Sequence, residues 1–511
     1  MPLSLFLALA ALAQAAPCVM PPGRPLPILR KFVSASVDAE IASLVPRFKD
    51  PNLAVLFSNT LPNTLDTTVY KHTVSPLDTF IVTGDIEAMW QRDSTNQVWP
   101  YLRFLSSDAP LRTLVAGLIR RQIANTLAQP YANAFQIDNS TVGPHAGDAS
   151  IPAGAASSNY VFEYKYELDS LANVLRLSAG YWAATQDTSP FDSTWLAAVQ
   201  LILATMRDQQ QGSEEEDLAG GPAYGFQRTT SEPSDSLDHL RGPVARRTGM
   251  VKAAFRGSDD AQVLPFSIPE NAYAAVALGN VTALLAALGH SAEAAAATAL
   301  AADIRAGIAQ YGIMQHPIAK VAVYAYEVDG FGSQYFMDDA NIPSLMAMPY
   351  YGFVEASDAL YQQTRAALLS GASNPYYMCG TAGCGIGGPH NGWPYVWPMA
   401  IAIQSWTASS DAEVEQTLQL LVNSSACTGF IHESFDSEWA GRARAKGSAA
   451  WQRPLFAHQL TLSLTPPPPS LLSLPEDDVN KFTRKWFAWV NSLFADLVMK
   501  IAKERPHLIF A

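Results

Sequence analysis

The sequence has little charge, few basic residues and few cysteines. Charged residues make up 15% of its 511 residues, and 33 basic side chains stand against 46 acidic ones, a net charge of −13. Hydrophobic residues make up 49%, which excludes a disordered chain. The shortage of basic residues argues against a nucleic acid or an anionic membrane surface as a partner.

Long hydrophobic runs are also missing, since no stretch after the N-terminal segment reaches the ~18 apolar residues of a membrane span. Residues 1–15 form a short apolar stretch that ends in small residues, the pattern of a signal peptide cleaved after about Ala15. We therefore expect a protein that is secreted or lies in the lumen of the secretory pathway, without stable membrane insertion after cleavage. Sequons at Asn139, Asn280 and Asn423 predict a glycoprotein.

The four cysteines are Cys18, Cys379, Cys384 and Cys427. An oxidising compartment allows disulfides, and four thiols permit three full pairings, which the sequence leaves open. Cys379 and Cys384 are close enough for a local bridge across a glycine-rich turn. The spacing has no zinc-site pattern, so we expect no metal.

Several catalytic motifs are absent. The chain contains no P-loop, no G-x-G-x-x-G after a strand, no H-E-x-x-H and no G-x-S-x-G. We therefore expect no cofactor.

Apolar residues recur at helical spacing along most of the chain. They predict helices around 111–118, 168–182, 196–206 and 418–421, and an alanine-rich helix over 291–311 with Ser291 as its N-cap. Strand-like runs are few, with 320–326 the best of them. The polar stretch 208–247 predicts a long surface loop, and 380–388 a flexible loop. This pattern favours one large, mainly helical domain of paired helices.

Five segments concentrate carboxylates, arginine and tryptophan, namely 83–94, 163–169, 255–260, 337–341 and 432–435. Most precede a predicted helix, so a ring of helices would gather them at one rim. Helix capping or a surface ion pair would explain any one of them. Together, with Trp90, Trp393 and Trp397 nearby, they indicate a pocket for a polyol, because carboxylates accept hydroxyl hydrogen bonds and aromatic faces stack on sugar rings. Glycoside hydrolysis needs two carboxyl groups, and composition alone does not choose them.

These segments resemble glycoside hydrolase family 125, the exo-α-1,6-mannosidases, in its fungal-type secreted form. The matching stretches follow the family order: TGDIEAMWQRDSTNQVWPYL (83–102), FEYKYELDSLANVLRLS (162–178), GMVKAAFRGSDDAQVLPFSIPENAYA (249–274), YAYEVDGFGSQYFMDDANIPSLMAMPYYGF (324–353), GIGGPHNGWPYVWPMAIAIQ (385–404), TGFIHESF (428–435) and FTRKWFAWVNSLFA (482–495).

The resemblance implies an all-α fold, an (α/α)6 barrel forming one catalytic domain over residues 30–508. It implies metal-independent, inverting removal of terminal α-1,6-linked mannose from a mannose-containing glycan. The general acid would be Asp259 or Asp260, with Asp259 preferred, and Glu433 would be the general base. The side chains expected to bind the sugar are Asp85, Trp90, Arg92, Asp93, Glu167, Asp169, Arg256, Asp338, Asp339 and His390.

The chain departs from the family at Glu87 and Gly257, where proline is expected, and more strongly at residues 437–477. That stretch separates HESF from FTRKWF and contains a proline tetrad. It is either a true insertion, disordered by its composition, or translated non-coding sequence. Because the stretch follows Glu433, a catalytically inactive mannose-binding protein on the same scaffold is the alternative function. A lyase or a phosphorylase on this scaffold is disfavoured, because the segments offer no basic site and no phosphate pocket.

Overall fold

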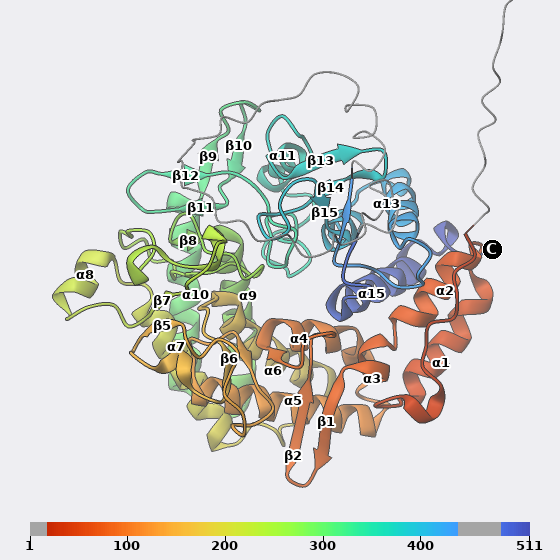
Figure 1. Cartoon of the computed structure of the whole chain (residues 1–511), viewed down its shortest axis with the longest axis horizontal. Coiled ribbons are helices and arrows are strands. Elements are labelled where there is room, and N and C mark those ends of the chain that lie inside the picture. Colours follow the sequence, from red (N-terminus) through yellow and green to blue (C-terminus); the bar gives the residue numbers. More distant parts are fainter. Residues whose placement is uncertain (1–17, 438–481) are drawn as a thin grey trace, which may run out of the picture.

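The computed structural model describes residues 18–437 and 482–511. The expected signal peptide and nearly all of the 437–477 stretch therefore lie outside the described residues. Figure 1 shows a helix-rich molecule whose helices surround a common centre. The helices are α1 Ala35–Leu44, α2 Pro51–Thr60, α3 Asn63–Thr67, α4 Gln91–Val98, α5 Ala109–Ala128, α6 Leu168–Thr185, α7 Ser193–Asp208, α8 Ser213–Leu218, α9 Ile268–Ala287, α10 Ser291–Tyr311, α11 Ala359–Leu368, α12 Pro398–Trp406, α13 Asp411–Ser424 and α15 Ala488–Glu504.

The helices form an inner and an outer ring. Helices α15, α4, α6 and α9 pack in succession and α12 packs on α15, and these inner helices are buried on most faces. Helices α2, α5, α7, α10, α11 and α13 lie outside them, where Figure 1 shows them at the periphery. Between α9 and α12 the inner ring is completed by turns over 340–358, because Tyr351 packs on Tyr273 of α9 and Tyr350 packs on Trp406 of α12.

The apolar stripes predicted the helices α5, α6, α7 and α13 correctly, because each stripe faces the core. Helix α10 covers the expected residues, but the N-cap prediction was wrong. The cap residue is His290, and no side chain caps the first turn. Ser291 is instead the first helical residue.

The strands are short and form small two- and three-stranded sheets in the loops between helices. They are β1 Val69–Val74, β2 Leu77–Ile81, β3 Met89–Trp90, β4 Ala134–Phe135, β5 Ala149–Ile151, β6 Val161–Glu163, β7 Gly225–Gln227, β8 Phe266–Ser267, β9 Ile313–Gln315, β10 Ala322–Tyr324, β11 Glu327–Val328, β12 Gln334–Tyr335, β13 Tyr377–Gly380, β14 Gly383–Ile386, β15 Tyr395–Val396, β16 Ser434–Asp436 and β17 Phe482–Thr483. The strand expected at 320–326 is confirmed as β10, which pairs antiparallel with β9.

Two segments expected to be irregular contain regular structure. The stretch 208–247 includes β7 and helix α8, whose start is stabilised by the Glu215 carboxylate accepting from the Gly212 N–H. Residues 380–388 belong largely to the hairpin of β13 and β14, in which Cys379 pairs with Cys384 as a disulfide. The local bridge is thus confirmed, and the prediction of a flexible loop was wrong, because cross-strand pairing and the bridge fix both strands.

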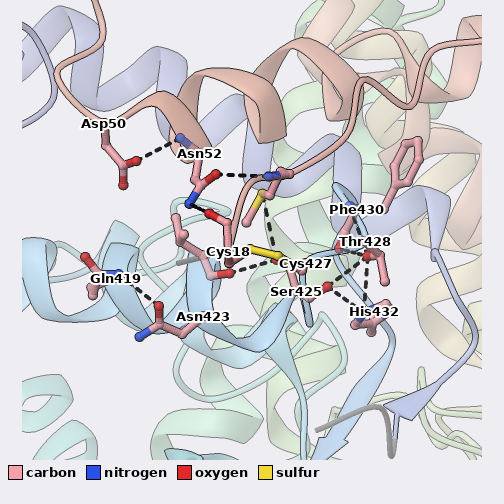
Figure 2. The surroundings of a disulfide bond; sticks show 12 residues. Cys18, Asp50, Asn52, Gln419, Asn423, Ser425, Cys427, Thr428, Phe430 and His432 are labelled. Carbon is pink, nitrogen blue, oxygen red and sulfur yellow. Dashed lines mark hydrogen bonds between the residues drawn. A yellow bond between two sulfur atoms is a disulfide. The ribbon is translucent and has the colours of Figure 1, made fainter. Parts of the chain in front are cut away.

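The second disulfide joins Cys18 to Cys427 across 409 positions of sequence (Figure 2). Asn52 of α2 holds the N-terminal segment in place by donating to the Cys18 carbonyl at 2.9 Å and accepting from the Met20 N–H at 3.2 Å. On the other side, His432 Nε2 lies 3.0 Å from the Ser425 carbonyl oxygen. The disulfide therefore anchors the chain that leads to Glu433.

Candidate active site

Helix α4 places two charged side chains at the centre of the ring. It is polar along its whole length and yet fully buried. Its Arg92 guanidinium lies 2.5 Å from Glu167, 3.1 Å from Asp259 and 3.7 Å from Asp169. Burial opposes the charge, but the attraction of Glu167, Asp169 and Asp259 outweighs it and raises the pKa of Arg92. Arg92 is therefore a permanent cation that gathers three carboxyl groups.

The neighbouring Asp93 carboxyl is buried beside Arg92, with 3.6 Å between Oδ2 and Arg92 Nε. Burial raises the pKa of Asp93 to about 6, although Arg92 acts in the opposite direction. A carboxyl with this pKa exchanges its proton readily near neutral pH, which suits a group that hydrogen-bonds hydroxyls.

Asp259 lies in a tight loop closed by a bridge between Phe255 and Ala261, and its φ of 67° is in the left-handed region. Its Oδ1 accepts hydrogen bonds from Trp90 Nε1 at 3.2 Å, Arg92 at 3.1 Å and Asn133 Nδ2 at 3.2 Å. Burial favours the neutral acid, yet the charges of Arg92 and Lys165 lower the pKa of Asp259 well below its usual range. Asp259 is thus ionised.

Glu167, in contrast to Asp259, favours the protonated form. It precedes the first turn of α6 and is fully buried, which raises its pKa well above the usual range in spite of Arg92. Asn133 Nδ2 donates to its Oε1 at 3.0 Å and to Asp259 Oδ1 at 3.2 Å, so one amide joins the two carboxyls. Asp259 and Glu167 therefore form a pair of acids that retains one proton, held by Glu167.

His390 lies against the adjacent carboxylate, with 3.5 Å between its Nδ1 and Asp260 Oδ2. Burial disfavours a cation here, but the negative charges of Asp260, Asp259 and Glu433 raise the pKa of His390 to about 9. His390 is therefore positively charged at neutral pH.

Glu433 comes just before β16, which pairs with β15 on one side and β17 on the other. The β17 strand leads to Arg484, whose Nε lies 3.3 Å from Glu433 Oε1 and whose Nη1 lies 3.6 Å from Asp85. His432 stacks on Phe482 with 3.6 Å between ring centroids. These contacts fix the Glu433 carboxylate from both sides.

One cavity joins these groups. Among the predicted residues, those that line it are Trp90, Arg92, Asp93, Asp259, His390 and Glu433. The aromatic rings of Trp397, Phe487 and Trp489 form part of its wall. The space is narrow, about 40 Å³. The candidate acid Asp259 and the candidate base Glu433 thus open onto the same space.

The other predicted side chains hold their neighbours in place and do not line this cavity. Asp169 and Glu167 face Arg92, and Asp339 accepts from the Ser258 hydroxyl at 2.7 Å. Arg256 pairs with Glu327 at 2.7 Å, while Asp260 faces His390 and Asp85 faces Arg484. For these residues a direct contact with sugar stays a prediction.

Asp338 and Trp393 lie differently from expectation. Asp338 accepts from the backbone N–H groups of Leu345 and Met346, and burial raises its pKa to about 8. Asp338 therefore stabilises the turns that complete the inner ring. Trp393 is 58% exposed and does not line the cavity, whereas Trp90 and Trp397 do.

Sequence reasoning missed Arg484, Asn133 and Glu270. Arg484 stands in the aromatic FTRKWF stretch, where its charge was the available signal. Asn133 bridges Glu163, Glu167 and Asp259 through one amide nitrogen, and nothing in its local sequence indicates this. Glu270 is buried in the first turn of α9 without a hydrogen-bond partner for either carboxyl oxygen.

Residues 18–437 and 482–511 contain neither a metal-binding cluster nor a membrane-spanning helix. No cluster of three or more His, Cys, Asp or Glu side chains that would suit a metal ion lies in this part of the chain. No helix there has both the length and the apolar character needed to cross a lipid bilayer.

Comparison with known proteins identifies the class. The chain belongs to glycoside hydrolase family 125, the metal-independent α-mannosidases, whose sequence model matches residues 50–462. It is therefore a glycosidase, and the resemblance seen in the sequence is confirmed.

Two particular relatives cover almost the whole chain. The meiotically up-regulated gene 157 protein of Schizosaccharomyces pombe is 40% identical over 502 residues, which is 96% of this chain and 91% of the yeast protein. A metal-independent α-mannosidase of Streptococcus pneumoniae, solved as a non-productive complex with α-1,6-mannobiose, is 35% identical with a TM-score of 0.78, covering 92% of this chain and 99% of that one.

A bacterial glucoamylase solved with acarbose shares the fold at 11% identity and a TM-score of 0.50, covering 91% of this chain and 56% of the glucoamylase. With these neighbours the double ring of helices is confirmed as an (α/α)6 barrel.

Proposed function

We propose that this chain removes terminal α-1,6-linked mannose from the non-reducing ends of mannosides and N-glycans, with inversion at the anomeric carbon. The observation that carries the proposal is the single cavity shared by Asp259 and Glu433. Family membership supplies the α-mannosidase chemistry, and the mannobiose bound to the pneumococcal relative supports the linkage.

In this mechanism Glu433 takes a proton from a water molecule, which attacks the anomeric carbon from the face opposite the leaving oxygen. Asp259 donates a proton to that oxygen as the glycosidic bond breaks. An inverting pair requires carboxyl groups about 6.5–9.5 Å apart, so that water fits between one of them and the sugar. Of the two candidate acids, Asp259 lines the cavity with Glu433, which favours it over Asp260.

The acid needs a proton, which Asp259 lacks in the empty site. We assign its source to Glu167, because the buried Glu167 carboxyl shares Arg92 and Asn133 with Asp259 and keeps its proton at neutral pH. When the leaving oxygen of the substrate approaches Asp259, it favours transfer of the proton from Glu167 to the Asp259 carboxylate. Arg92 touches both carboxyls and holds their geometry during the transfer.

We also propose that the protein works in the secretory pathway or outside the cell. The two disulfides leave no free cysteine in the part of the chain that the structure describes, which suits an oxidising compartment. The sequon residues Asn139, Asn280 and Asn423 are all exposed, as glycan acceptors must be.

The proposal is tested with mannobioses that differ only in linkage, while NMR follows the anomer released first. We expect hydrolysis of the 1,6-linked disaccharide and early β-mannose. Release of α-mannose first would contradict inversion, and cleavage of 1,2- or 1,3-linked mannobiose without the 1,6-linked one would contradict the specificity.

The variant Glu433→Gln should lower kcat by about 10²–10⁴-fold, since it removes the general base, and should still bind mannobiose. Glu355→Gln, the same change at an exposed position, is the matched control. Full activity of Glu433→Gln would assign the base elsewhere. A wild-type protein that binds mannobiose without cleaving it would instead be the inactive binding protein.

A further inference from the structure

The stretch 208–247, which the catalytic site does not use, forms the wall of a second hollow surface. A cavity of about 680 Å³ lies beside α8, and another of about 520 Å³ lies next to it. Asp238, Gly242 and Pro243 line both, so the two form one continuous depression, here named the rim groove. It is far larger than the catalytic cavity.

The rim groove begins where the catalytic cavity ends. Arg256 and Pro389 line the groove, and the residues that follow them, Gly257 and His390, line the catalytic cavity. Two separate chain segments therefore pass from one space to the other. The groove therefore lies next to the space proposed for the terminal sugar of a glycan.

The two cations beside α8 are paired within the groove, where Glu214 and Asp238 add negative charge. Lys252 forms an ion pair with Glu216, and Arg241 pairs with Asp217 at 2.7 Å. No cation of this wall is left to hold a phosphate or a carboxylate, and the paired groups still offer hydrogen bonds to hydroxyls. The groove thus suits a neutral, polyhydroxylated ligand.

Aromatic and apolar groups provide the other half of a sugar site. Tyr166 and Tyr224 line the larger cavity, and the buried Tyr166 hydroxyl has no hydrogen-bond partner. Leu218 and Val244 stand at its edge with 83% and 65% of their surface exposed. Such apolar faces beside hydrogen-bonding groups match the C–H faces and hydroxyls of pyranose rings.

We propose that the rim groove binds the mannose units of the glycan beyond its terminal disaccharide, so that the enzyme prefers long mannosides to disaccharides. That the ligand is a mannoside rests on the proposed function. That a ligand binds here rests on the shape and lining of the groove alone.

The kinetic test compares kcat/KM for α-1,6-linked mannotetraose and mannobiose. In the wild type we expect the tetraose to be favoured about 10-fold, which corresponds to about 1.4 kcal/mol of added transition-state binding. Arg241→Ala should abolish this preference and leave kcat/KM for mannobiose unchanged. Leu218→Asp, a change at an exposed apolar position of α8 in the same wall, should act in the same way.

Arg247→Ala is the matched control, because Arg247 pairs with Glu215 on the same segment and does not line the groove. If mannobiose is cleaved and the tetraose preference is absent, or is the same in Arg241→Ala as in the control, the groove proposal is wrong while the proposed function stands.

A binding measurement separates the two proposals. Calorimetric titration of mannotetraose into Glu433→Gln should show weaker binding when Arg241→Ala is added and no change when Arg247→Ala is added. This result supports the groove even if mannobiose is never hydrolysed, an outcome that would overturn the proposed function. Equal affinity in all three variants would overturn the groove.

Discussion

At the scale of single residues, the site is a set of ionisable side chains, and the protonation state of each one depends on a charged neighbour. Arg92 holds Asp259 ionised, Glu167 keeps the proton of that pair, and Asp260 keeps His390 charged. The substitution of one member therefore changes the charge of another. Such coupling is common where acid–base chemistry takes place.

His390 leads to a pH prediction. Its pKa is about 9 in the folded protein and about 6.5 when unfolded, so the folded state binds the proton more tightly. Its contribution to the free energy of unfolding is fully present below pH 6.5 and is lost as the pH rises through 9. His390→Gln should therefore destabilise the protein most at pH 6 and progressively less toward pH 9.5.

Urea unfolding of the wild type and the variant across this range measures the effect. His239→Gln, the same change at an exposed histidine, is the control. A His390→Gln difference that stays constant across this pH range would show that Asp260 does not keep the imidazole charged.

At the scale of elements, α4 shows how a polar helix is accommodated in a core. Its side chains find partners on the surrounding helices, and Gln122 of α5 alone donates to the Gln91 carbonyl at 3.2 Å, Ser94 at 3.0 Å and Thr95 at 2.9 Å. Arg176 of α6 donates to Asn96 at 2.8 Å. This network positions Arg92 and Asp93 without any apolar face.

Gln122→Met should lower the free energy of unfolding by about 1–3 kcal/mol, because it leaves buried acceptors on α4 without a donor. Gln416→Met, at an exposed position of α13, should change it by no more than about 0.5 kcal/mol. Urea unfolding gives both values. Equal stabilities would show that water or other side chains replace the Gln122 amide.

The same helix shows the limit of sequence-based prediction. Stripes of apolar residues located α5, α6, α7 and α13, since each has one face on the core. They could not locate α4, which is short, polar and buried all round. Apart from β10, the short strands were also invisible, because runs of two to six residues carry too little alternation to be recognised.

For the site, the motifs identified which segments meet but not which side chains face the cavity. Arg92 and Asp93 line it, while Glu167 and Asp169, equally prominent in the sequence, lie behind Arg92. This division depends on how the helices are rotated in the ring. The contribution of Asn133 depends on the β3–β4–β6 sheet and was beyond reach of any local pattern.

At the scale of the whole molecule, the Cys18–Cys427 disulfide connects the first described segment to the end of α13. The Cys18→Ser/Cys427→Ser variant should lose about 2–4 kcal/mol of stability, because the cross-link restricts a very long loop in the unfolded chain. The Cys379→Ser/Cys384→Ser variant, which opens a bridge between residues five apart, should lose less. Urea unfolding without reductant ranks the two, and the reverse order would argue against a chain-entropy origin.

The antiparallel pairing of β16 with β17 has a consequence for the length of the connection between these strands. The pairs Ser434–Thr483 and Phe435–Phe482 hold the two strands together next to the positions between which residues 438–481 are inserted in the sequence. Doubling the length of a flexible connection adds only about 0.6 kcal/mol of closure entropy. The pairing of β16 with β17 therefore tolerates connections of different length at little cost in free energy.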